Sequence, residues 1–295
     1  METANVAIGQ RLVRRLLAEQ FPQWAGLALQ HVESTGTDNV IFRLGERLAV
    51  RLPRVDWAAG QAQKEHRWLP VLAPSLPLPV PAPLALGAPA DGYPWPWSVC
   101  RWLEGESVSL ERVADEEAFA ADLAGFVAQL HQIDATGGPA PGAHNFHRGA
   151  LLAVRDRHTR AAIAAVQGGL DPGALTAAWE AALAAPAWSG PPVWIHGDLQ
   201  GGNLLCDDGR LSAVIDFGGL GVGDPACDLI VAWNLLTAKG RAAFRSALDA
   251  DDASWARGRG WALSASLVAL SYYRESNPAV AGAARRTIAE ILAEA

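Results

Sequence analysis

The chain has 295 residues and a formal net charge of −7, and half of its residues are hydrophobic. This length suits one large domain or two packed lobes with a full core. The acidic balance argues against a general nucleic-acid binder.

Signals for secretion or membrane insertion are weak in this sequence. Three arginines, Arg11, Arg14 and Arg15, interrupt the only candidate for the apolar part of a signal peptide. The uncharged run from 69 to 90 contains seven prolines, more than a transmembrane helix tolerates. The three cysteines are an odd number without metal-ligand spacing, which indicates reduced thiols. We therefore expect a cytoplasmic protein that binds neither membranes nor nucleic acids.

Charge is unevenly distributed along the chain. Residues 1–103 carry 10 Lys or Arg against 8 Asp or Glu, a balance of +2, whereas residues 104–295 carry 14 against 23, a balance of −9. One interpretation is a solvated acidic surface. The other is a first part that handles an anion and a second part that attracts a cation.

The first hundred residues favour a small sheet with two helices. A helical apolar face predicts a helix over 6–20. Strand-like runs follow at 27–32, 39–44 and 47–53, and the turns between them predict two successive antiparallel hairpins. A helix is expected over 58–69. The proline-rich stretch 70–83 predicts an extended surface connector, and strands at 84–88 and 97–103 complete the sheet.

The pattern after Gly105 is mostly helical. Residues 135–149, rich in Gly, Pro and His, are expected to form a loop over one face. Strands followed by helices indicate an α+β fold, with an N-terminal lobe over 1–103 and a helical lobe over 104–295. The predicted helices are 115–133, 150–166, 173–185, 224–237, 241–248, 255–274 and 278–293.

The stretch 193–217 differs from its helical surroundings. An apolar run over 193–195 predicts a buried strand, and Asp198 follows it closely. Two further strand-like runs are joined by a Gly-containing turn over 207–210. With that turn at the tip, facing residue numbers sum to about 417, which places Asn203 opposite Val214 and close to Asp216. We therefore expect Asp198, Asn203 and Asp216 to meet at one end of the hairpin.

These three side chains suit phosphoryl transfer. Carboxylate and amide oxygens are hard donors that favour Mg²⁺ over softer metals. An Asp that orients the acceptor hydroxyl, an Asn after four intervening residues and an Asp-Phe-Gly are the parts of such a site. They stand here as Asp198, Asn203 and Asp216-Phe217-Gly218. Taken alone, Asp216 could equally be a strand-end Asp that binds its own turn.

The chain resembles the aminoglycoside phosphotransferase family over nearly its whole length. The resemblance implies a bilobal, protein-kinase-like fold and ATP- or GTP-dependent transfer to a hydroxyl group. It further implies that Asp198 is the catalytic base and that Asn203 and Asp216 bind Mg²⁺. The motifs that carry it are His196-Gly197-Asp198-Leu199, Gly202-Asn203, Val214-Ile215-Asp216-Phe217-Gly218 and Gly223-Asp224-Pro225-Ala226-Cys227-Asp228-Leu229.

Two positions depart from the family pattern. Gln200-Gly201 stands where many members have His-Pro, and Gly219 stands where an acidic or bulky residue is frequent. Neither departure removes a catalytic atom. Both leave the shape of the loop and its contacts with the acceptor open.

A kinase of this fold needs a cation on the third strand, paired with a carboxylate on the next helix, to hold the α- and β-phosphates. The two lysines, Lys64 and Lys239, do not fall on a strand. Arg51 is therefore the candidate cation and Glu65 its expected partner, because a guanidinium can grip a carboxylate and a phosphate together. Without the resemblance, Arg51 would be an ordinary exposed strand residue.

Two further segments are expected to contact the nucleotide. Between the first two strands, Ser34, Thr35 and Thr37 would cover the phosphates with hydroxyl and backbone donors. The segment 99–103 is the expected hinge between lobes, with the adenine against Cys100 and Trp102.

Several polar residues near these motifs are expected to be structural. His196 is expected to brace the loop more than to act as a base, and His131 to be a satisfied buried histidine. Asp224 before a proline has the pattern of a helix N-cap. Asp228 could either brace the catalytic loop or be solvated.

Several functions fit these residues to different degrees. The leading hypothesis is transfer of the γ-phosphoryl group of ATP or GTP to a hydroxyl of a small molecule, foremost an aminoglycoside-type antibiotic, with a role in antibiotic resistance. The acidic second part would suit a polycationic acceptor. A macrolide or other hydroxylated compound is the alternative, and a nucleotide-binding pseudokinase is another. A protein kinase lacks support because a helix start follows Asp216 within about ten residues, and a hydrolase would need more histidine ligands. The oligomeric state stays open.

Overall fold

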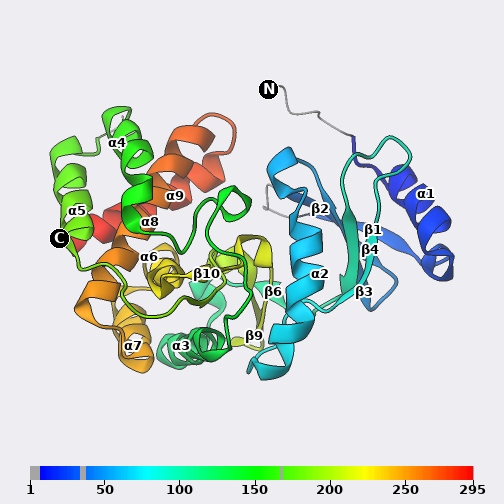
Figure 1. The fold of residues 1–295 in the computed structure, drawn as a ribbon, viewed down its shortest axis with the longest axis horizontal. Helices are drawn as coiled ribbons and strands as arrows, with labels where there is room; N and C mark the ends of the chain where they lie inside the picture. Colours follow the sequence, from blue (N-terminus) through cyan, green and yellow to red (C-terminus); the bar gives the residue numbers. More distant parts are fainter. Residues whose placement is uncertain (1–6, 34–37, 167–168, 295) are drawn as a thin grey trace.

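The computed structural model describes residues 7–33, 38–166 and 169–294. The N-terminal part contains a sheet and two helices, and the C-terminal part is mostly helical. Helix α2 (Gln61–Leu72) lies between the sheet and the helical part (Figure 1). The predicted α+β class is therefore confirmed.

The five strands of the N-terminal sheet are all antiparallel, in the order β1-β2-β3-β5-β4. The two predicted hairpins are therefore confirmed, and β5 pairs with β3 on one side and β4 on the other. The strands are β1 (Leu29–Val32), β2 (Asn39–Leu44), β3 (Leu48–Pro53), β4 (Pro83–Gly87) and β5 (Trp97–Arg101).

Helix α1 (Gln10–Gln20) lies on the side of the sheet away from the helical part (Figure 1). It buries the apolar face that the sequence predicted, Leu12, Val13, Leu16 and Leu17. These side chains join those of the strands and Trp97 in a separate hydrophobic cluster. The N-terminal sheet thus has a core of its own.

The proline-rich stretch is only partly extended, which corrects the sequence prediction. Helix α2 includes Pro70 and ends at Leu72, and a 3₁₀ turn follows over Ala73–Ser75. Leu69 and Leu72 are fully buried, so packing extends the helix by part of a turn despite the hydrogen bond that proline cannot make. The extended connector begins only after this turn.

In the described part of the chain, seven helices form most of the C-terminal part, and their apolar faces build the larger hydrophobic cluster. Two predicted helices begin as 3₁₀ turns instead, over Leu152–Arg155 and Pro225–Ile230. The helices are α3 (Glu116–Gln132), α4 (Asp156–Ala164), α5 (Pro172–Ala184), α6 (Val231–Asn234), α7 (Ala238–Leu248), α8 (Asp252–Tyr273) and α9 (Pro278–Ala293).

The larger cluster also takes in Leu69 and Leu72 of α2 and Val80 of the connector. Helix α2 therefore packs against the helical part as well as against the sheet. A division of the chain into lobes at residue 103 stays a prediction.

Two small sheets lie within the helical part. In one, β10 (Gly221–Gly223) pairs with β7 (Val193–Ile195), and in the other β8 (Leu204–Asp207) lies between β6 (Glu106–Ser107) and β9 (Arg210–Val214). The turn between β8 and β9 is confirmed, with Asp208 and Gly209 both at positive φ.

The predicted register of this hairpin is wrong by one residue at its open end. Near the turn the facing numbers sum to 417, as in Cys206 opposite Leu211, but a bulge follows and Leu204 lies opposite Val214. Ser212 is the extra residue on β9. Asn203 therefore lies just outside the ladder, where its carbonyl oxygen accepts the N–H of Ile215 at 2.9 Å.

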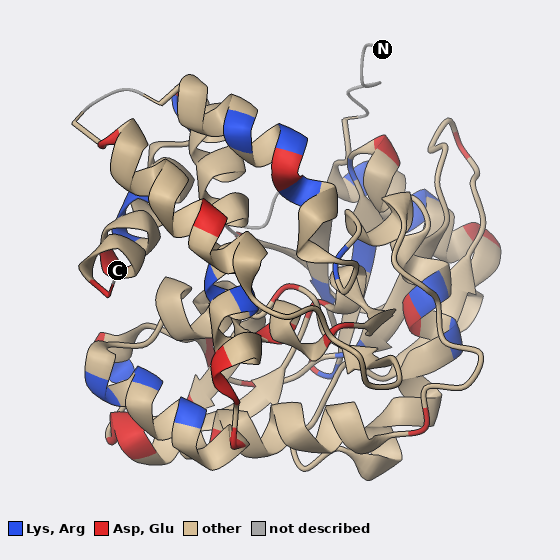
Figure 2. Ribbon diagram, turned by 60° about the vertical axis from the view of Figure 1, so that its left-hand side comes forward, with Lys and Arg blue, Asp and Glu red and all other residues tan. Residues whose placement is uncertain are grey.

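All three cysteines are free, as the sequence predicted, and the structure shows that they are also buried. Burial raises the pKa of Cys100 to about 11 and also raises that of Cys227. None of the helices in the described part of the chain combines the length and apolar character that crossing a bilayer requires. Charged positions of both signs are scattered over both parts of the molecule (Figure 2), so the charge imbalance along the sequence is not a division into a basic and an acidic body.

Candidate active site

The loop that carries Asp198 begins where the buried strand β7 ends. Gly197 has a φ of +80°, and a Cβ at this position would lie 2.6 Å from the carbonyl oxygen of Gly219. Only glycine fits both the backbone conformation and the close approach. The glycine therefore lets the chain turn sharply so that Asp198 leaves the sheet edge.

His196 braces this turn, as predicted. Its Nδ1 accepts the backbone N–H of Asp198 at 3.1 Å, so its Nε2 donates to the carbonyl oxygen of Ile215 at 3.0 Å. The ring is fully buried and packs against Phe217. Because both nitrogens are engaged, the histidine holds the catalytic loop to the strand before Asp216 and has no free nitrogen to act as a base.

Asp228, for which the sequence left two interpretations open, also braces the loop. Its fully buried carboxylate accepts the backbone N–H groups of His196 and Gly197 at 2.9 and 2.7 Å. His131 lies 3.3 Å from the same carboxylate, in agreement with its predicted structural role. Charge-assisted hydrogen bonds of this kind are strong in a buried setting, so Asp228 fixes the backbone at the start of the loop.

Asp224 caps the 3₁₀ turn over Pro225–Ile230, as its sequence pattern indicated. The structure adds a partner that the sequence did not reveal. Arg257 of α8 binds both carboxylate oxygens of Asp224, at 2.8 and 3.1 Å, and both side chains are buried. The bidentate pair fixes the segment after Asp216 to the helical core.

Asp198 is held at both carboxylate oxygens. Its Oδ1 accepts from Arg148 at 2.7 Å, and its Oδ2 accepts from Gln200 and Asn203 at 3.1 Å each. Asn203 also donates to the backbone carbonyl of Asp198 at 2.7 Å. The side chain is still partly exposed, so an acceptor hydroxyl can reach it.

Asp216 sits at the end of β9 with a left-handed backbone, at φ 62° and ψ 72°. A non-glycine residue in this region is strained, and such strain is typical of functional sites. Its Oδ1 accepts from Arg51 at 3.1 Å and from the N–H of Gly218 at 3.4 Å. The hairpin thus places Asp216 next to the strand that carries Arg51.

Arg51 joins the N-terminal sheet to this site. From β3 it donates through Nη1 to Glu65 of α2 at 2.5 Å and through Nη2 to Asp216 at 3.1 Å. Burial alone would lower the pKa of Arg51, but the carboxylates of Glu65 and Asp216 raise it above its ordinary value. Arg51 is therefore a permanent cation between the two parts of the chain, and is not an exposed strand residue.

One atom of this ion pair lacks a partner. Glu65 is buried, and its second oxygen, Oε1, accepts no hydrogen bond in the described structure. Buried polar atoms are almost always satisfied, so this position suits a donor from water or a bound ligand.

The hinge differs in part from the sequence expectation. The N–H groups of Arg101 and Trp102 are already bonded to the carbonyls of Ala82 and Arg47, at 2.9 and 2.8 Å. A purine held here would have to use hinge carbonyls or the residues after Trp102. The indole Nε1 of Trp102 is buried and has no hydrogen-bond partner among the described residues. The assignment of Cys100 and Trp102 to the adenine stays a prediction.

The predicted phosphate cover, Ser34, Thr35 and Thr37, lies outside the described residues. The next residue, Asp38, is hydrogen-bonded to α2 and to the segment just before that helix. Asp38 accepts from Gln61 at 3.1 Å and from Trp57 at 3.3 Å. The described end of the segment therefore lies close to the helix that carries Glu65.

The oxygen donors present fit a magnesium ion. Asn203 uses Nδ2 for both bonds to Asp198, and its Oδ1 accepts none from the described residues. Asp216 likewise keeps Oδ2 available. Across the described ranges, no three His, Cys, Asp or Glu side chains gather as a metal site. One carboxylate and one amide oxygen instead match Mg²⁺, which takes few protein ligands when phosphates and water supply the rest.

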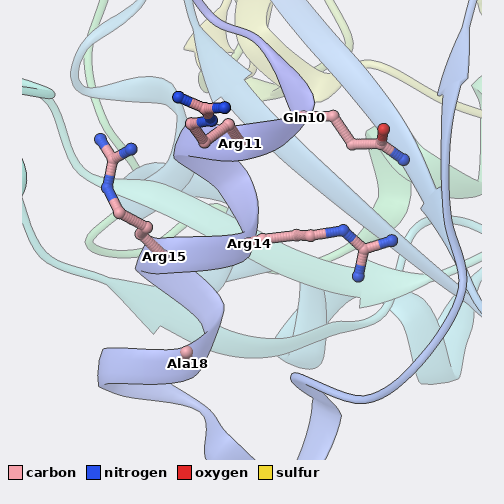
Figure 3. Close-up of a pocket in the computed structure, with 5 residues that line it drawn as sticks. All are labelled: Gln10, Arg11, Arg14, Arg15 and Ala18. Carbon is pink, nitrogen blue, oxygen red and sulfur yellow. The ribbon is translucent and has the colours of Figure 1, made fainter.

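One cavity lies away from this constellation and another lies beside it, with Lys64 in its lining. One, of about 420 Å³, is lined by Gln10, Arg11, Arg14, Arg15 and Ala18 on the outer side of α1 (Figure 3). There the arginines point in different directions, and Arg15 is paired with Asp91 at 2.6 Å. The other, of about 340 Å³, lies between α2 and the loop around His144.

Sequence reasoning missed two cations at the site. Arg148 comes from the loop over 135–149 and binds Asp198. Lys64 donates to the carbonyl of Gly218 at 2.6 Å, and burial lowers its pKa to about 8. Neither lies on a strand, where a phosphate-binding cation was expected. The only signal for Arg148 was its place before a glycine in a loop rich in Gly, Pro and His.

Comparison with solved structures shows a shared fold at low sequence identity. The GDP complex of wild-type aminoglycoside 2′-phosphotransferase-IIIa matches with a TM-score of 0.76 and 18% identity, over 97% of this chain and 99% of that chain. The GDP and kanamycin complex of APH(2″)-IIIa matches at 0.75 and 20%, over 97% and 99%. Macrolide 2′-phosphotransferase MphH from Brachybacterium faecium matches at 0.61 and 24%, over 94% and 97%. The predicted kinase-like fold is therefore confirmed.

Comparison with curated proteins gave no significant match. The profile of the APH phosphotransferase enzyme family, in contrast, matches residues 32–261. This range contains most of the N-terminal sheet, Arg51, Glu65 and the whole catalytic segment, and it covers more than half of the chain. The chain therefore belongs to the APH phosphotransferase enzyme family.

Proposed function

We propose that this protein transfers the γ-phosphoryl group of ATP or GTP to a hydroxyl group of a small molecule. The observation that carries the proposal is a single network at the junction of sheet and helices. Arg51 links Glu65 to Asp216, while Asn203 binds Asp198 and accepts the N–H of the residue before Asp216. The network brings an expected phosphate cation, metal ligands and base into one place.

Each residue has a part in this reaction. Asp198 accepts the hydrogen bond of the acceptor hydroxyl and directs its oxygen in line with the phosphoryl group. Asn203 and Asp216 hold Mg²⁺, which, when bound, offsets charge on the phosphate oxygens. Arg51, kept in place by Glu65, binds the α- and β-phosphates. Positioning and charge neutralisation supply the rate enhancement.

The acceptor we propose first is an aminoglycoside-type antibiotic, with a role in resistance. The fold is shared with a phosphotransferase solved in complex with the aminoglycoside kanamycin, which supports such an acceptor. A macrolide is the second candidate, because a macrolide phosphotransferase shares the fold at 24% identity.

The test is phosphoryl transfer by the purified protein. We would incubate it with Mg²⁺ and γ-labelled ATP or GTP, together with kanamycin, gentamicin, streptomycin or erythromycin, and detect labelled product. Transfer to one of these compounds is expected with at least one nucleotide. Nucleotide binding without transfer to any acceptor or to water would instead indicate a pseudokinase. The presence of Asp198, Asn203 and Asp216 in one network counts against that outcome.

A further inference from the structure

The loop that carries Arg148 is fixed along the catalytic segment. We call residues 139–149 the strap. The carbonyl of Pro139 accepts the N–H of Val222 at 2.9 Å, and the carbonyl of Gly149 accepts the N–H of Asp224 at 2.8 Å. Both ends of the strap are therefore bound to the segment that follows Asp216.

A fully buried side chain fixes the middle of the strap. Asn145 has no exposed surface, and its Oδ1 accepts the N–H of Gly142 at 3.0 Å. Its Nδ2 donates to the carbonyl of Arg148 at 3.1 Å and approaches that of Gly219 at 3.5 Å. One amide thus fixes the turn in the strap and connects it to the residues after the Asp-Phe-Gly.

The backbone of the strap is strained where it presents Arg148. Phe146 and His147 are consecutive non-glycine residues with φ of 55° and 59°. Gly149 has φ of 81°, and a Cβ there would lie 2.7 Å from the side chain of Ile195. Left-handed backbone at non-glycine residues costs free energy and is typical of sites where a side chain must be held in one place.

This backbone directs the guanidinium of Arg148 to Asp198. Its Nη2 lies 2.7 Å from Oδ1 of Asp198, with the two side chains 22% and 29% exposed. Burial lowers the pKa of Arg148, but the Asp198 carboxylate beside it raises the pKa overall. Within the described ranges this is the only hydrogen bond that the guanidinium makes. The strap thus delivers one permanent charge to one oxygen of the expected base.

We propose that Arg148 is a positioning residue that orients the carboxylate of Asp198 for the acceptor hydroxyl. Gln200 and Asn203 hold the other oxygen, so the three donors together fix the plane of the carboxylate. A small misplacement of a reacting group can cost about 10²-fold in rate. This inference rests on the proposed function, because it gives Arg148 a task only if Asp198 assists the transfer.

The test compares Arg148→Met and Arg148→Lys with a matched control, Arg157→Met, which removes an exposed arginine nine residues further along the chain. The probes are kanamycin and erythromycin with Mg²⁺ and ATP or GTP, and water as acceptor in nucleotide hydrolysis. For Arg148→Met we expect kcat to fall about 10- to 100-fold, with the nucleotide Kd and acceptor KM unchanged. Arg148→Lys should restore part of the rate, and Arg157→Met should match the wild type.

A double-mutant cycle shows whether Arg148 acts through Asp198. In the Asp198→Ala background, Arg148→Met should cause no further loss of rate, because there is no carboxylate left to position. Asn145→Ala removes the hydrogen bonds that fix the strap but keeps the Arg148 side chain in the sequence. This variant should lower kcat by a smaller factor than Arg148→Met. Its loss should not add to that of Arg148→Met. Thermal unfolding and nucleotide binding identify any variant that fails to fold.

Three outcomes would overturn the inference. One is a wild-type rate for a folded Arg148→Met, and another is a faster rate, which would make the pair an inhibitory contact. The third is an equal loss of rate with and without Asp198, which would show that Arg148 acts independently. No transfer by the wild-type protein to any acceptor or to water would overturn the proposed function and this inference with it.

Discussion

Two arginines bind carboxylates of the candidate site, and they reach it by different routes. Arg51 extends from a central strand of the N-terminal sheet, between a helix carboxylate and Asp216. Arg148 extends from a strained loop whose shape depends on Asn145 and Gly149. Regular elements deliver the first charge and a fixed irregular segment delivers the second. The difference suggests that Arg51 serves nucleotide binding and Arg148 serves the chemical step.

The largest expected effect comes from removing Asp198, the proposed base, which Arg148 contacts. Asp198→Ala should lower kcat about 10³-fold, as loss of a general base does, while the Kd for nucleotide changes little. Rapid-quench or steady-state transfer assays, with calorimetry for nucleotide, measure both. The control is Asp207→Ala, which changes an exposed residue of the β8–β9 hairpin. Full activity in Asp198→Ala would refute its role.

The opposite pattern is expected on the Arg51 side. Arg51→Met should weaken nucleotide binding about 10- to 100-fold, since it removes the charged hydrogen bonds proposed for the phosphates and leaves Glu65 without its partner. Arg54→Met, which removes an exposed charge three residues away, is the control. Fluorescence or calorimetric titration with ATP and GTP measures the change. If Arg51→Met lowers only kcat and Arg148→Met lowers only nucleotide affinity, the roles assigned to the two arginines are wrong.

A third ion pair, Arg257 with Asp224, is expected to contribute to stability and not to substrate binding. Arg257→Met should lower the free energy of unfolding by about 3 kcal/mol, because Asp224 becomes a buried charge without a partner. The double variant with Asp224→Asn should recover part of this loss. Arg160→Met, in an exposed pair, should cost about 0.5 kcal/mol or less. Equal denaturation midpoints for Arg257→Met and the wild type would contradict the assignment.

The smallest effect concerns Lys64, which connects α2 to the residues after Asp216. Its partly buried amine should titrate near pH 8, below the ordinary 10.5, whereas the hydrogen bond that Lys239 donates to Glu117 raises the pKa of Lys239. Lys64 is therefore charged below pH 8 and loses its charge as pH rises through that value. NMR of the ¹³C-methylated lysines separates the two, since the chain has no others. Titration of both amines above pH 10 would contradict the prediction.

The parts of the fold and site that could be predicted are those on regular elements. The strands and most helices followed from periodicity and element order, because side-chain direction is fixed within a strand or helix. The contact of Arg51 with Glu65 followed from the family resemblance, which implies a strand cation paired with a helix carboxylate. The meeting of Asn203 with the end of the strand before Asp216 followed from hairpin geometry. The exact register did not, since a bulge at Ser212 has no clear sequence signal.

Contacts that depend on distant packing could not be predicted. The extension of α2 through Pro70 follows from burial of Leu69 and Leu72 against another part of the chain. The Arg257 and Asp224 pair joins residues 33 apart in sequence. Arg148 reaches Asp198 only because a buried asparagine fixes a loop that local propensity leaves undetermined. These contacts are set by tertiary structure.

The bulge at Ser212 restricts how this hairpin can vary in length. Side chains alternate between the two faces of a strand, so a single inserted or deleted residue would turn the open end over and carry Asp216 away from Arg51. Changes to the turn over 207–210 must therefore come in pairs, or be matched by loss of the bulge. Relatives with a hairpin one residue shorter should lack the extra residue on β9.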